Sequence, residues 1–235
     1  MWDDEIQRIM VIVAHPDDTE FGVGGTVAKL TQAGKEVTYV ICTNGDKGSS
    51  DPEMTSERLA EIREQEQRVA AQLLGVKEVV FLGYRDGELM PTLELRRDIT
   101  REIRRYKPDA VFTQDPTTRY IGQVYINHPD HRAAGEAALA AVFPSARDRL
   151  TFPELAAEGL EPHKVREVYL TLTLAPDYWV DITDTLDLKI AALMEHRSQF
   201  EDPQRIVEWV RERARQVAEG QGMSYAEAFK RLTLS

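Results

Sequence analysis

The chain has a single cysteine among its 235 residues, Cys42. An internal disulfide or a cysteine-rich metal cluster needs more than one cysteine, so both are excluded. The sequence also has no apolar run near the roughly 20 residues that cross a bilayer. Its first nine residues carry three acidic side chains and no apolar segment, which does not match a signal peptide. These absences favour a soluble cytoplasmic protein.

Positive charge is scarce relative to negative charge. The chain has 29 Lys and Arg residues against 40 Asp and Glu residues, which gives a formal net charge of −11 at pH 7. Because such a chain repels phosphate groups, we expect neither a nucleic-acid partner nor attachment to an anionic membrane surface. Hydrophobic residues make up 42% of the chain and charged residues 29%, which is the balance of an ordinary globular protein.

Segments typical of buried strands alternate with segments typical of helices. Continuous apolar runs such as IMVIVA indicate strands that are buried on both faces. We predict strands over residues 9–14, 37–43, 79–82, 110–113 and 165–174. We predict helices over residues 24–33, 55–74, 93–106, 131–142 and 184–200, followed by one or two charged helices over residues 203–232.

This alternation predicts an α/β fold: a single Rossmann-like domain over residues 1–235, with a mostly parallel sheet and helices on both faces. The tail, from about residue 203 to 235, is expected to form a helical extension. In open sheets of this kind, ligands bind outside the carboxyl ends of the strands. The residues that follow each strand are therefore the first candidates for chemistry.

Two His-Pro-Asp tripeptides follow two of the predicted strands, at His15 and at His128. Imidazole nitrogens and carboxylate oxygens are zinc ligands, and a catalytic zinc needs three protein ligands with one position left open. A facial set can be drawn from His15, Asp18 and His131. Two neutral histidines and one carboxylate leave the site with a net positive charge, which favours polarisation of a carbonyl group.

Each of these residues also has a simpler interpretation. A histidine after a strand is often only a polar loop residue. Asp17 or Asp18 could cap a helix, and Asp130 could cap the helix that begins near His131. The sequence motif alone leaves these alternatives open, but two such tripeptides at two strand ends favour metal-assisted chemistry.

Further segments give the chain a resemblance to a known family. It resembles the LmbE/PIG-L family of zinc-dependent N-acetylglucosaminyl deacetylases, in the same order along nearly the whole chain. The segments that carry the resemblance are residues 14–20 (AHPDDTE), 24–26 (GGT), 43–48 (TNGDKG), 63–66 (REQE), 74–76 (LGV), 128–131 (HPDH), 196–199 (HRSQ) and 225–229 (YAEAF).

The resemblance implies roles for particular residues. His15, Asp18 and His131 would bind Zn²⁺, and Asp17 would be the general base that activates water. His128 would be the general acid or would stabilise the oxyanion, and Asp130 would orient a histidine.

The resemblance also implies how the substrate binds. Arg63 and Asp86 would hold sugar hydroxyl groups. The family often has a tyrosine close before the HPDH segment, whereas here Tyr125 lies three residues before His128 and Tyr120 lies further back.

The expected function is removal of an N-acetyl group from an N-acetylglucosamine-type sugar or glycoside, a small-molecule partner. One alternative is an amidase that acts on another N-acyl or thiol-conjugated glucosaminide. An alternative from another class is a non-catalytic sugar- or nucleotide-binding module, which would need neither the metal nor Asp17. The resemblance also implies a homo-oligomer.

Overall fold

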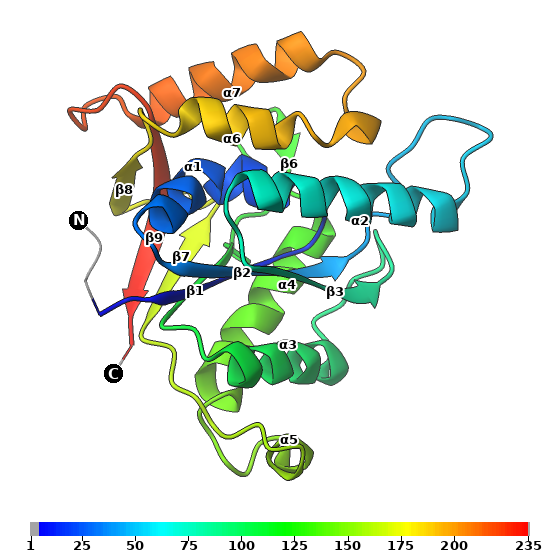
Figure 1. The fold of residues 1–235 in the computed structure, drawn as a ribbon, viewed down its shortest axis with the longest axis vertical. Helices are drawn as coiled ribbons and strands as arrows, with labels where there is room; N and C mark the ends of the chain where they lie inside the picture. Colours follow the sequence, from blue (N-terminus) through cyan, green and yellow to red (C-terminus); the bar gives the residue numbers. More distant parts are fainter. Residues whose placement is uncertain (1–4, 235) are drawn as a thin grey trace.

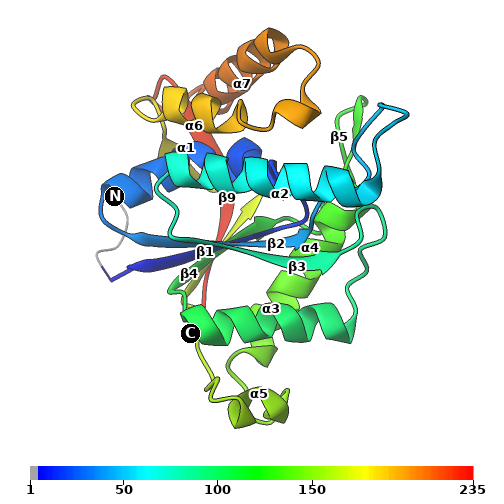
Figure 2. The same cartoon turned by 45° about the vertical axis from the view of Figure 1, so that its right-hand side comes forward.

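The computed structural model describes residues 5–234, in which a seven-stranded sheet forms the centre. The strands are β1 (Arg8–Val13), β2 (Glu36–Thr43), β3 (Glu78–Tyr84), β4 (Ala110–Gln114), β7 (Glu167–Thr171), β8 (Tyr178–Asp181) and β9 (Ala226–Thr233). Their order across the sheet is β3-β2-β1-β4-β7-β9-β8 (Figures 1 and 2). The neighbouring pairs β3–β2, β2–β1, β1–β4 and β4–β7 are parallel, whereas β9 runs antiparallel to both β7 and β8.

Helices cover both faces of this sheet. One face carries α1 (Asp18–Gln32), α2 (Ser56–Leu73), α6 (Leu186–Leu193) and α7 (Pro203–Val217), and the other carries α3 (Leu93–Tyr106) and α4 (Pro129–Ala140) (Figure 1). The short helix α5 (Pro153–Ala157) lies beyond α3, away from the sheet. A π-helical turn (Ala141–Ser145) follows α4, and a 3-10 turn (Arg197–Gln199) follows α6. The predicted α/β domain with a mostly parallel sheet and helices on both faces is confirmed. No helix within residues 5–234 is long and apolar enough to cross a membrane.

The apolar run of β1 supplies both layers of the core. Ile9, Val11 and Val13 pack in the core on the side of α1 and α2. Met10 and Ile12 pack in the core on the side of α3 and α4. Successive side chains of a strand point to opposite faces. A strand with helices on both sides therefore needs an unbroken apolar run, and that is the pattern in this sequence.

The sheet changes its winding direction between β1 and β4. The chain leaves β1 through α1 to β2, on one side of β1, and later crosses through α3 on the opposite face to reach β4 on the other side (Figure 2). The carboxyl ends of β1 and β4 therefore lie next to a crevice where ligands bind in open α/β sheets. His15 follows β1, and the loop after β4 leads through the hairpin of β5 (Tyr120–Ile121) and β6 (Tyr125–Ile126) to α4.

The prediction that the first helix begins at Gly24 was wrong. The helix begins at Asp18, because a tight turn joins it to β1: the amide of Asp18 donates to the carbonyl of His15 at 3.4 Å, and the amide of Phe21 donates to that of Asp17 at 3.0 Å. The turn brings the carboxylates of Asp17 and Asp18 to the sheet edge.

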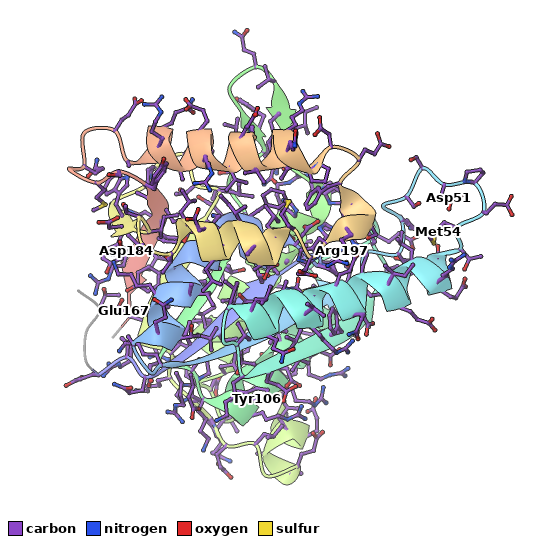
Figure 3. The ribbon with its side chains drawn as sticks, turned by 45° about the horizontal axis from the view of Figure 1, so that its top comes forward. Asp51, Met54, Tyr106, Glu167, Asp184 and Arg197 are labelled. Carbon is purple, nitrogen blue, oxygen red and sulfur yellow. The ribbon has the colours of Figure 1, made fainter. Side chains whose placement is uncertain are left out.

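The expected helix over residues 184–200 was also too long. α6 ends at Leu193, and the next residues turn so that the side chain of His196 is buried against Glu20. The amide and hydroxyl groups of Ser198 both donate to the carboxylate of Glu66 on α2, at 2.8 and 2.7 Å. Figure 3 shows Arg197 in this turn, close to α2. These contacts hold the HRSQ segment in a turn.

The predicted helical tail was correct only as far as Val217. Gly220 and Gly222 then take positive φ angles of 77° and 73°, which end the helical course, and β9 enters the sheet between β7 and β8. β8 was not predicted, and the strand expected over residues 165–174 is confined to Glu167–Thr171. The described residues after α7 thus end in a strand of the sheet rather than in a further helix.

Candidate active site

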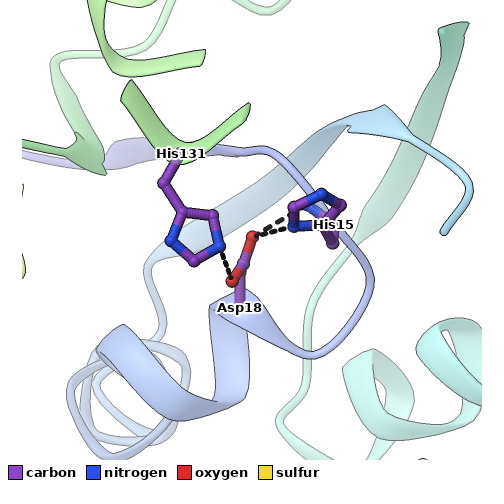
Figure 4. A group of neighbouring side chains, drawn as sticks. All are labelled: His15, Asp18 and His131. Atoms are coloured by element: carbon purple, nitrogen blue, oxygen red, sulfur yellow. Dashed lines mark hydrogen bonds and ion pairs between the residues drawn. The ribbon is translucent and has the colours of Figure 1, made fainter. Parts of the chain in front are cut away.

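Three predicted ligands meet at the switch point of the sheet. His15 follows β1, Asp18 opens α1, and His131 lies in the first turn of α4 (Figure 4). Asp18 lies between the two imidazoles: its Oδ1 is 3.0 Å from Nε2 of His131, and its Oδ2 is 3.4 Å from Nδ1 of His15. One possible ligand atom from each residue lies within 4.8 Å of the others. This group could hold a metal ion.

Asn127 fixes the orientation of the His131 ring. The side-chain amide of Asn127 donates to the carbonyl of Thr118 at 2.7 Å, so its oxygen faces Nδ1 of His131 at 2.9 Å. An amide oxygen only accepts, and Nδ1 of His131 must therefore carry the hydrogen. This leaves the lone pair on Nε2, which faces Asp18. Asn127 is fully buried and was not among the predicted site residues.

Two carboxylates fix the other imidazole. Nε2 of His15 lies 3.0 Å from Oδ1 of Asp86 and 3.2 Å from Oδ2 of Asp130. In the neutral ring, Nε2 carries the hydrogen and donates to these acceptors, so that the lone pair lies on Nδ1 and faces Asp18. Burial lowers the pKa of His15, but the hydrogen bonds to Asp130, Asp18 and Asp86 outweigh burial and raise the pKa well above its ordinary value. The three carboxylates around this ring therefore stabilise positive charge on it.

The donor set fits a metal such as zinc. With these tautomers, a carboxylate and two imidazole lone pairs face one another at 3.0 and 3.4 Å, an arrangement that needs a positive charge between them. A second possible group consists of His15, His128 and Asp130. Asp130, however, already accepts hydrogen bonds from the amides of Gly87 at 2.7 Å and Leu89 at 3.3 Å. The first group is therefore the better candidate.

The adjacent carboxylate of Asp17 lies in different surroundings. Its Oδ2 is 3.2 Å from a guanidinium nitrogen of Arg63. Burial raises the pKa of Asp17 to about 6, although the charge of Arg63 opposes this shift. In Asp18 burial acts in the same direction, but the two histidines outweigh it and hold the pKa well below its ordinary value. The two aspartates thus differ in protonation behaviour because their partners differ.

Arg63 is buried between the loops that follow β1 and β2. Its guanidinium donates to the carbonyls of Pro16 at 2.8 Å and Gly45 at 3.0 Å, in addition to Asp17. Gly45 has a φ of 66°, and a Cβ there would lie 2.3 Å from Arg63 Nη1. The glycine of the Asn44-Gly45 turn is thus needed to admit the guanidinium. The charge of Arg63 is directed at Asp17 rather than at solvent.

The alternative interpretation, in which these aspartates only cap the helices α1 and α4, does not account for the contacts of their side chains. Asp17 occupies the N-cap position of α1, but its side chain makes no capping hydrogen bond. α4 is capped by His128, whose Nδ1 accepts a hydrogen bond from the amide of Asp130 at 3.2 Å. Nε2 of neutral His128 therefore carries the hydrogen. Burial and the nearby charge of His15 lower the pKa of His128, which favours this neutral form.

The candidate ligands open onto a pocket of about 980 Å³. Its wall also includes the other predicted site residues except Asp130, namely Asp17, Arg63, Asp86 and His128. Beyond these residues, the wall is formed largely by aromatic and aliphatic side chains. Among them, Phe21 and Trp209 make an edge-on ring contact with centroids 5.9 Å apart. The pocket thus combines a polar end, where the imidazoles and carboxylates meet, with a more apolar end.

Tyr125 also lines this pocket, whereas Tyr120 does not appear in its wall among the described residues. Tyr125 is 41% exposed and lies on the β5–β6 hairpin, at the rim of the pocket. Of the two tyrosines singled out in the sequence, Tyr125 is thus the one that faces the site.

Sequence reasoning missed a buried polar group behind Asp17. The backbone amide of Asp17 donates to Oε1 of Gln67 at 2.9 Å. Nε2 of Gln67 donates to Glu20, whose carboxylate lies 3.0 Å from Nε2 of His196. Gln67, Glu20 and His196 are fully buried. A polar residue at a buried position of α2 was the only signal for Gln67, whereas His196 and Glu20 stood in the HRSQ and AHPDDTE segments of the resemblance without an assigned role.

Comparison with known proteins agrees with the site. Residues 10–142 match the family model described as PIG-L: GlcNAc-PI de-N-acetylase. The chain belongs to this family. The matched range includes both His-Pro-Asp tripeptides and all three candidate metal ligands, His15, Asp18 and His131.

Individual relatives cover most of the chain. A diacetylchitobiose deacetylase from Thermococcus kodakarensis is 38% identical over 196 residues, which are 83% of this chain and 71% of the relative. A probable N-acetyl-alpha-D-glucosaminyl L-malate deacetylase from Bacillus anthracis is 32% identical and covers 83% of this chain and 82% of its own. The solved structure of N,N'-diacetylchitobiose deacetylase from Pyrococcus horikoshii has a TM-score of 0.91 at 37% identity, over 97% of this chain and 85% of that chain.

Proposed function

We propose that this chain is a zinc-dependent hydrolase that removes the N-acetyl group from an N-acetylglucosamine-type sugar or glycoside. The observation that carries the proposal is the group of His15, Asp18 and His131, whose ligand atoms lie within 4.8 Å of one another on the pocket wall. The names of the relatives support the reaction, since each describes a deacetylase of such a sugar.

His15, Asp18 and His131 would hold the zinc ion. When bound, zinc polarises a carbonyl oxygen and lowers the pKa of water. Asn127, Asp86 and Asp130 would maintain the tautomers in which the imidazole lone pairs face the ion. Such partners of histidine ligands fix ring orientation and increase ligand basicity.

Asp17 would act as the general base. Its carboxylate lies on the pocket wall and is held through Oδ2 by Arg63. It is next in sequence to the ligand Asp18 but points to a different set of partners. This position lets Asp17 accept a proton from the attacking water without serving as a ligand.

His128 would act on the other side of the amide. Its Nδ1 accepts from the amide of Asp130, so Nε2–H is the group available to a substrate in the pocket. It can donate to the developing oxyanion or to the leaving nitrogen. Both roles need a hydrogen on Nε2, which the neutral tautomer provides.

Arg63 and Asp86 would contribute to binding of the sugar. Both line the pocket, and Nη1 of Arg63 lies 4.0 Å from Oδ2 of Asp86. Oδ1 of Asp86 accepts from His15, so Oδ2 is the oxygen left for a sugar hydroxyl group. The pocket volume of about 980 Å³ lies near the upper end of the range of about 300–1,000 Å³ for small-molecule sites, which leaves room for a second ring or an aglycone.

The experiment is a deacetylation screen with purified, zinc-reconstituted protein. N-acetylglucosamine, N,N'-diacetylchitobiose and other N-acetylglucosaminides are incubated with the enzyme, and released acetate and free amine are quantified. We expect one zinc per chain and equal amounts of acetate and amine. Cleavage of longer acyl groups or of thiol-conjugated glucosaminides in preference to acetyl groups would favour the amidase alternative.

Sugar binding without stoichiometric zinc and without acetate release would instead indicate a binding module. The cytoplasmic location and the homo-oligomeric state stay predictions. Size-exclusion chromatography with light scattering measures the second of these.

A further inference from the structure

We infer that Gln67 is a positioning residue that holds the backbone of Asp17, so that the carboxylate of Asp17 faces the reacting water. The inference rests on the proposed role of Asp17 as general base. Gln67 belongs to α2, is fully buried, and accepts a hydrogen bond from the amide of Asp17 at 2.9 Å.

The backbone of Asp17 needs such support. Its φ is 88° and its ψ is −29°, a left-handed conformation that is rare for residues other than glycine. Residues held in such regions cost free energy and persist only where several surrounding contacts fix them. A change of φ or ψ at Asp17 would redirect its carboxylate relative to Asp18. The direction in which the carboxylate of Asp17 points thus depends on the contacts that fix the backbone of this residue.

Two residues on one face of α2 hold Asp17 from two sides. Arg63 donates to the side-chain oxygen of Asp17 and to the carbonyl of Pro16. Gln67, one helical turn later, accepts from the amide of Asp17. Residues four apart on a helix point in the same direction, so α2 contacts both the carboxylate and the peptide of Asp17.

The amide group of Gln67 has only one orientation in this environment. Its nitrogen donates to both carboxylate oxygens of Glu20 at 3.1 Å and to the hydroxyl of Thr19 at 3.2 Å. Glu20 is in turn paired with His196. A flipped amide would place its oxygen against the carboxylate of Glu20 and its nitrogen against the amide of Asp17. The buried pair of Glu20 and His196 therefore keeps the oxygen of Gln67 directed at Asp17.

The test is a double-mutant cycle of Gln67→Met with Asp17→Asn. Methionine has a similar length but neither accepts from the Asp17 amide nor donates to Glu20. We expect Gln67→Met to lower kcat by roughly 10- to 100-fold, the effect of a misplaced catalytic group. KM should change by less than about twofold and the zinc content should stay at one per chain. The matched control is Gln65→Met, since Gln65 is exposed on the same helix and should leave kcat unchanged.

The cycle separates positioning from a merely structural role. If Gln67 acts through Asp17, Gln67→Met should lower kcat by less than about twofold once Asp17 is already Asn, because interacting residues are not additive. Three results would overturn the inference. They are an equal loss of kcat from Gln67→Met in both backgrounds, a change in KM without a change in kcat, and a kcat of Gln67→Met equal to that of the Gln65→Met control. If Gln67→Met does not fold, Gln67→Asn takes its place in the same cycle under the same criteria, because its polar side chain is one methylene shorter and does not reach the amide of Asp17 as Gln67 does.

Failure of the inference and failure of the proposed function give different results. An unchanged kcat in Asp17→Asn alone would contradict the assignment of the base, and the inference would fall with it. A large loss in Asp17→Asn together with wild-type kcat in Gln67→Met would overturn only the role of Gln67.

Discussion

Asp17 and Asp18 are neighbours in the sequence, yet their carboxylates face two different regions of the site. Asp18 faces the imidazole side, where His15 and His131 lie within 3.4 Å of its oxygens. Asp17 faces the α2 side, where Arg63 and Gln67 hold its carboxylate and its peptide. The pKa of Asp18 lies well below its ordinary value, whereas burial raises the pKa of Asp17 to about 6.

The comparison shows how one dipeptide can supply two chemical roles. Pairs of titratable groups whose environments separate their pKa values divide the work of a site. Here the separation comes from the left-handed backbone at Asp17, which turns the two side chains toward different partners. One carboxylate is suited to a cation, and the other is suited to accept a proton.

The largest effect is expected on the imidazole side, from His131→Ala. This change removes one of three candidate ligands, and we expect the protein to lose its metal and its activity together, to the background rate of hydrolysis. Metal content by elemental analysis and acetate release measure the two effects. A full zinc equivalent in the variant would remove His131 from the ligand set.

The next effect is expected on the α2 side, from Asp17→Asn. The amide keeps the shape of the side chain but cannot accept the proton. We expect zinc to stay near one per chain and kcat to fall by roughly 10²–10⁴-fold, the usual contribution of a positioned base. Loss of zinc in this variant would mean that the two aspartates have exchanged roles, and the comparison between them would be reversed.

His128→Ala addresses the third imidazole of the site, whose ring centroid lies 4.7 Å from that of His15 and 5.5 Å from that of His131. We expect kcat to fall by roughly 10²–10³-fold, as on removal of one oxyanion donor, with zinc retained. Because His128 also caps α4, the variant His128→Asn serves as its control: asparagine caps the helix but lacks the ring. A kcat in His128→Asn equal to that of the wild type would show that capping is the only role of His128.

The parallel half of the fold was more accessible to sequence reasoning than the C-terminal half. The strand at residues 9–14 is apolar at every position, because both of its faces are buried. β9 is rich in Ala, Glu, Lys and Arg, which favour helices, and its place in the sheet depends on distant partners. Glu227 of β9, for example, accepts from the amides of Gly25 and Thr26 and pairs with Lys189. No local pattern contains such contacts.

The same distinction applies to the site. The candidate metal ligands could be proposed from the sequence because each stands in or directly beside a short His-Pro-Asp motif. Asn127 and Gln67 were not, because their roles lie in single hydrogen bonds to His131 and to the Asp17 amide. Arg63 was predicted as a sugar-binding residue from the resemblance. Its ion pair with Asp17 depends on how α2 packs, which the motif does not reveal.

A smaller effect is expected on the imidazole side from Asp130→Asn. Asparagine keeps one oxygen to accept from Nε2 of His15, which faces Asp130 at 3.2 Å, but it lacks the negative charge that increases the basicity of this ligand. We expect zinc affinity to fall by roughly 10- to 100-fold, with kcat at saturating zinc close to that of the wild type. Competition with a chromogenic chelator measures the affinity. Asp51→Asn, in the exposed loop marked in Figure 3, is the control and should leave the affinity unchanged.

The smallest effect concerns stability on the α2 side and its dependence on pH. Burial lowers the pKa of His196, but the hydrogen bond and charge of Glu20, together with the charges of Asp17 and Glu66, outweigh burial and raise the pKa above its ordinary value. The stabilisation by protonated His196 is therefore complete below about pH 6.5, the ordinary histidine pKa, and is lost as pH rises through the raised pKa.

His163 has the opposite shift, because its burial lowers its pKa while its ring contacts the carbonyl of Pro108. We expect the Tm difference between the wild type and His196→Gln to be larger at pH 6 than at pH 9, by a few degrees, since about 1 kcal/mol corresponds to about 2–4 °C in a chain of this size. For His163→Gln the wild type should gain relative stability from pH 6 to pH 9 instead. Scanning calorimetry at both pH values measures the two trends, and the same trend in both variants would show that Glu20 does not stabilise a charged His196.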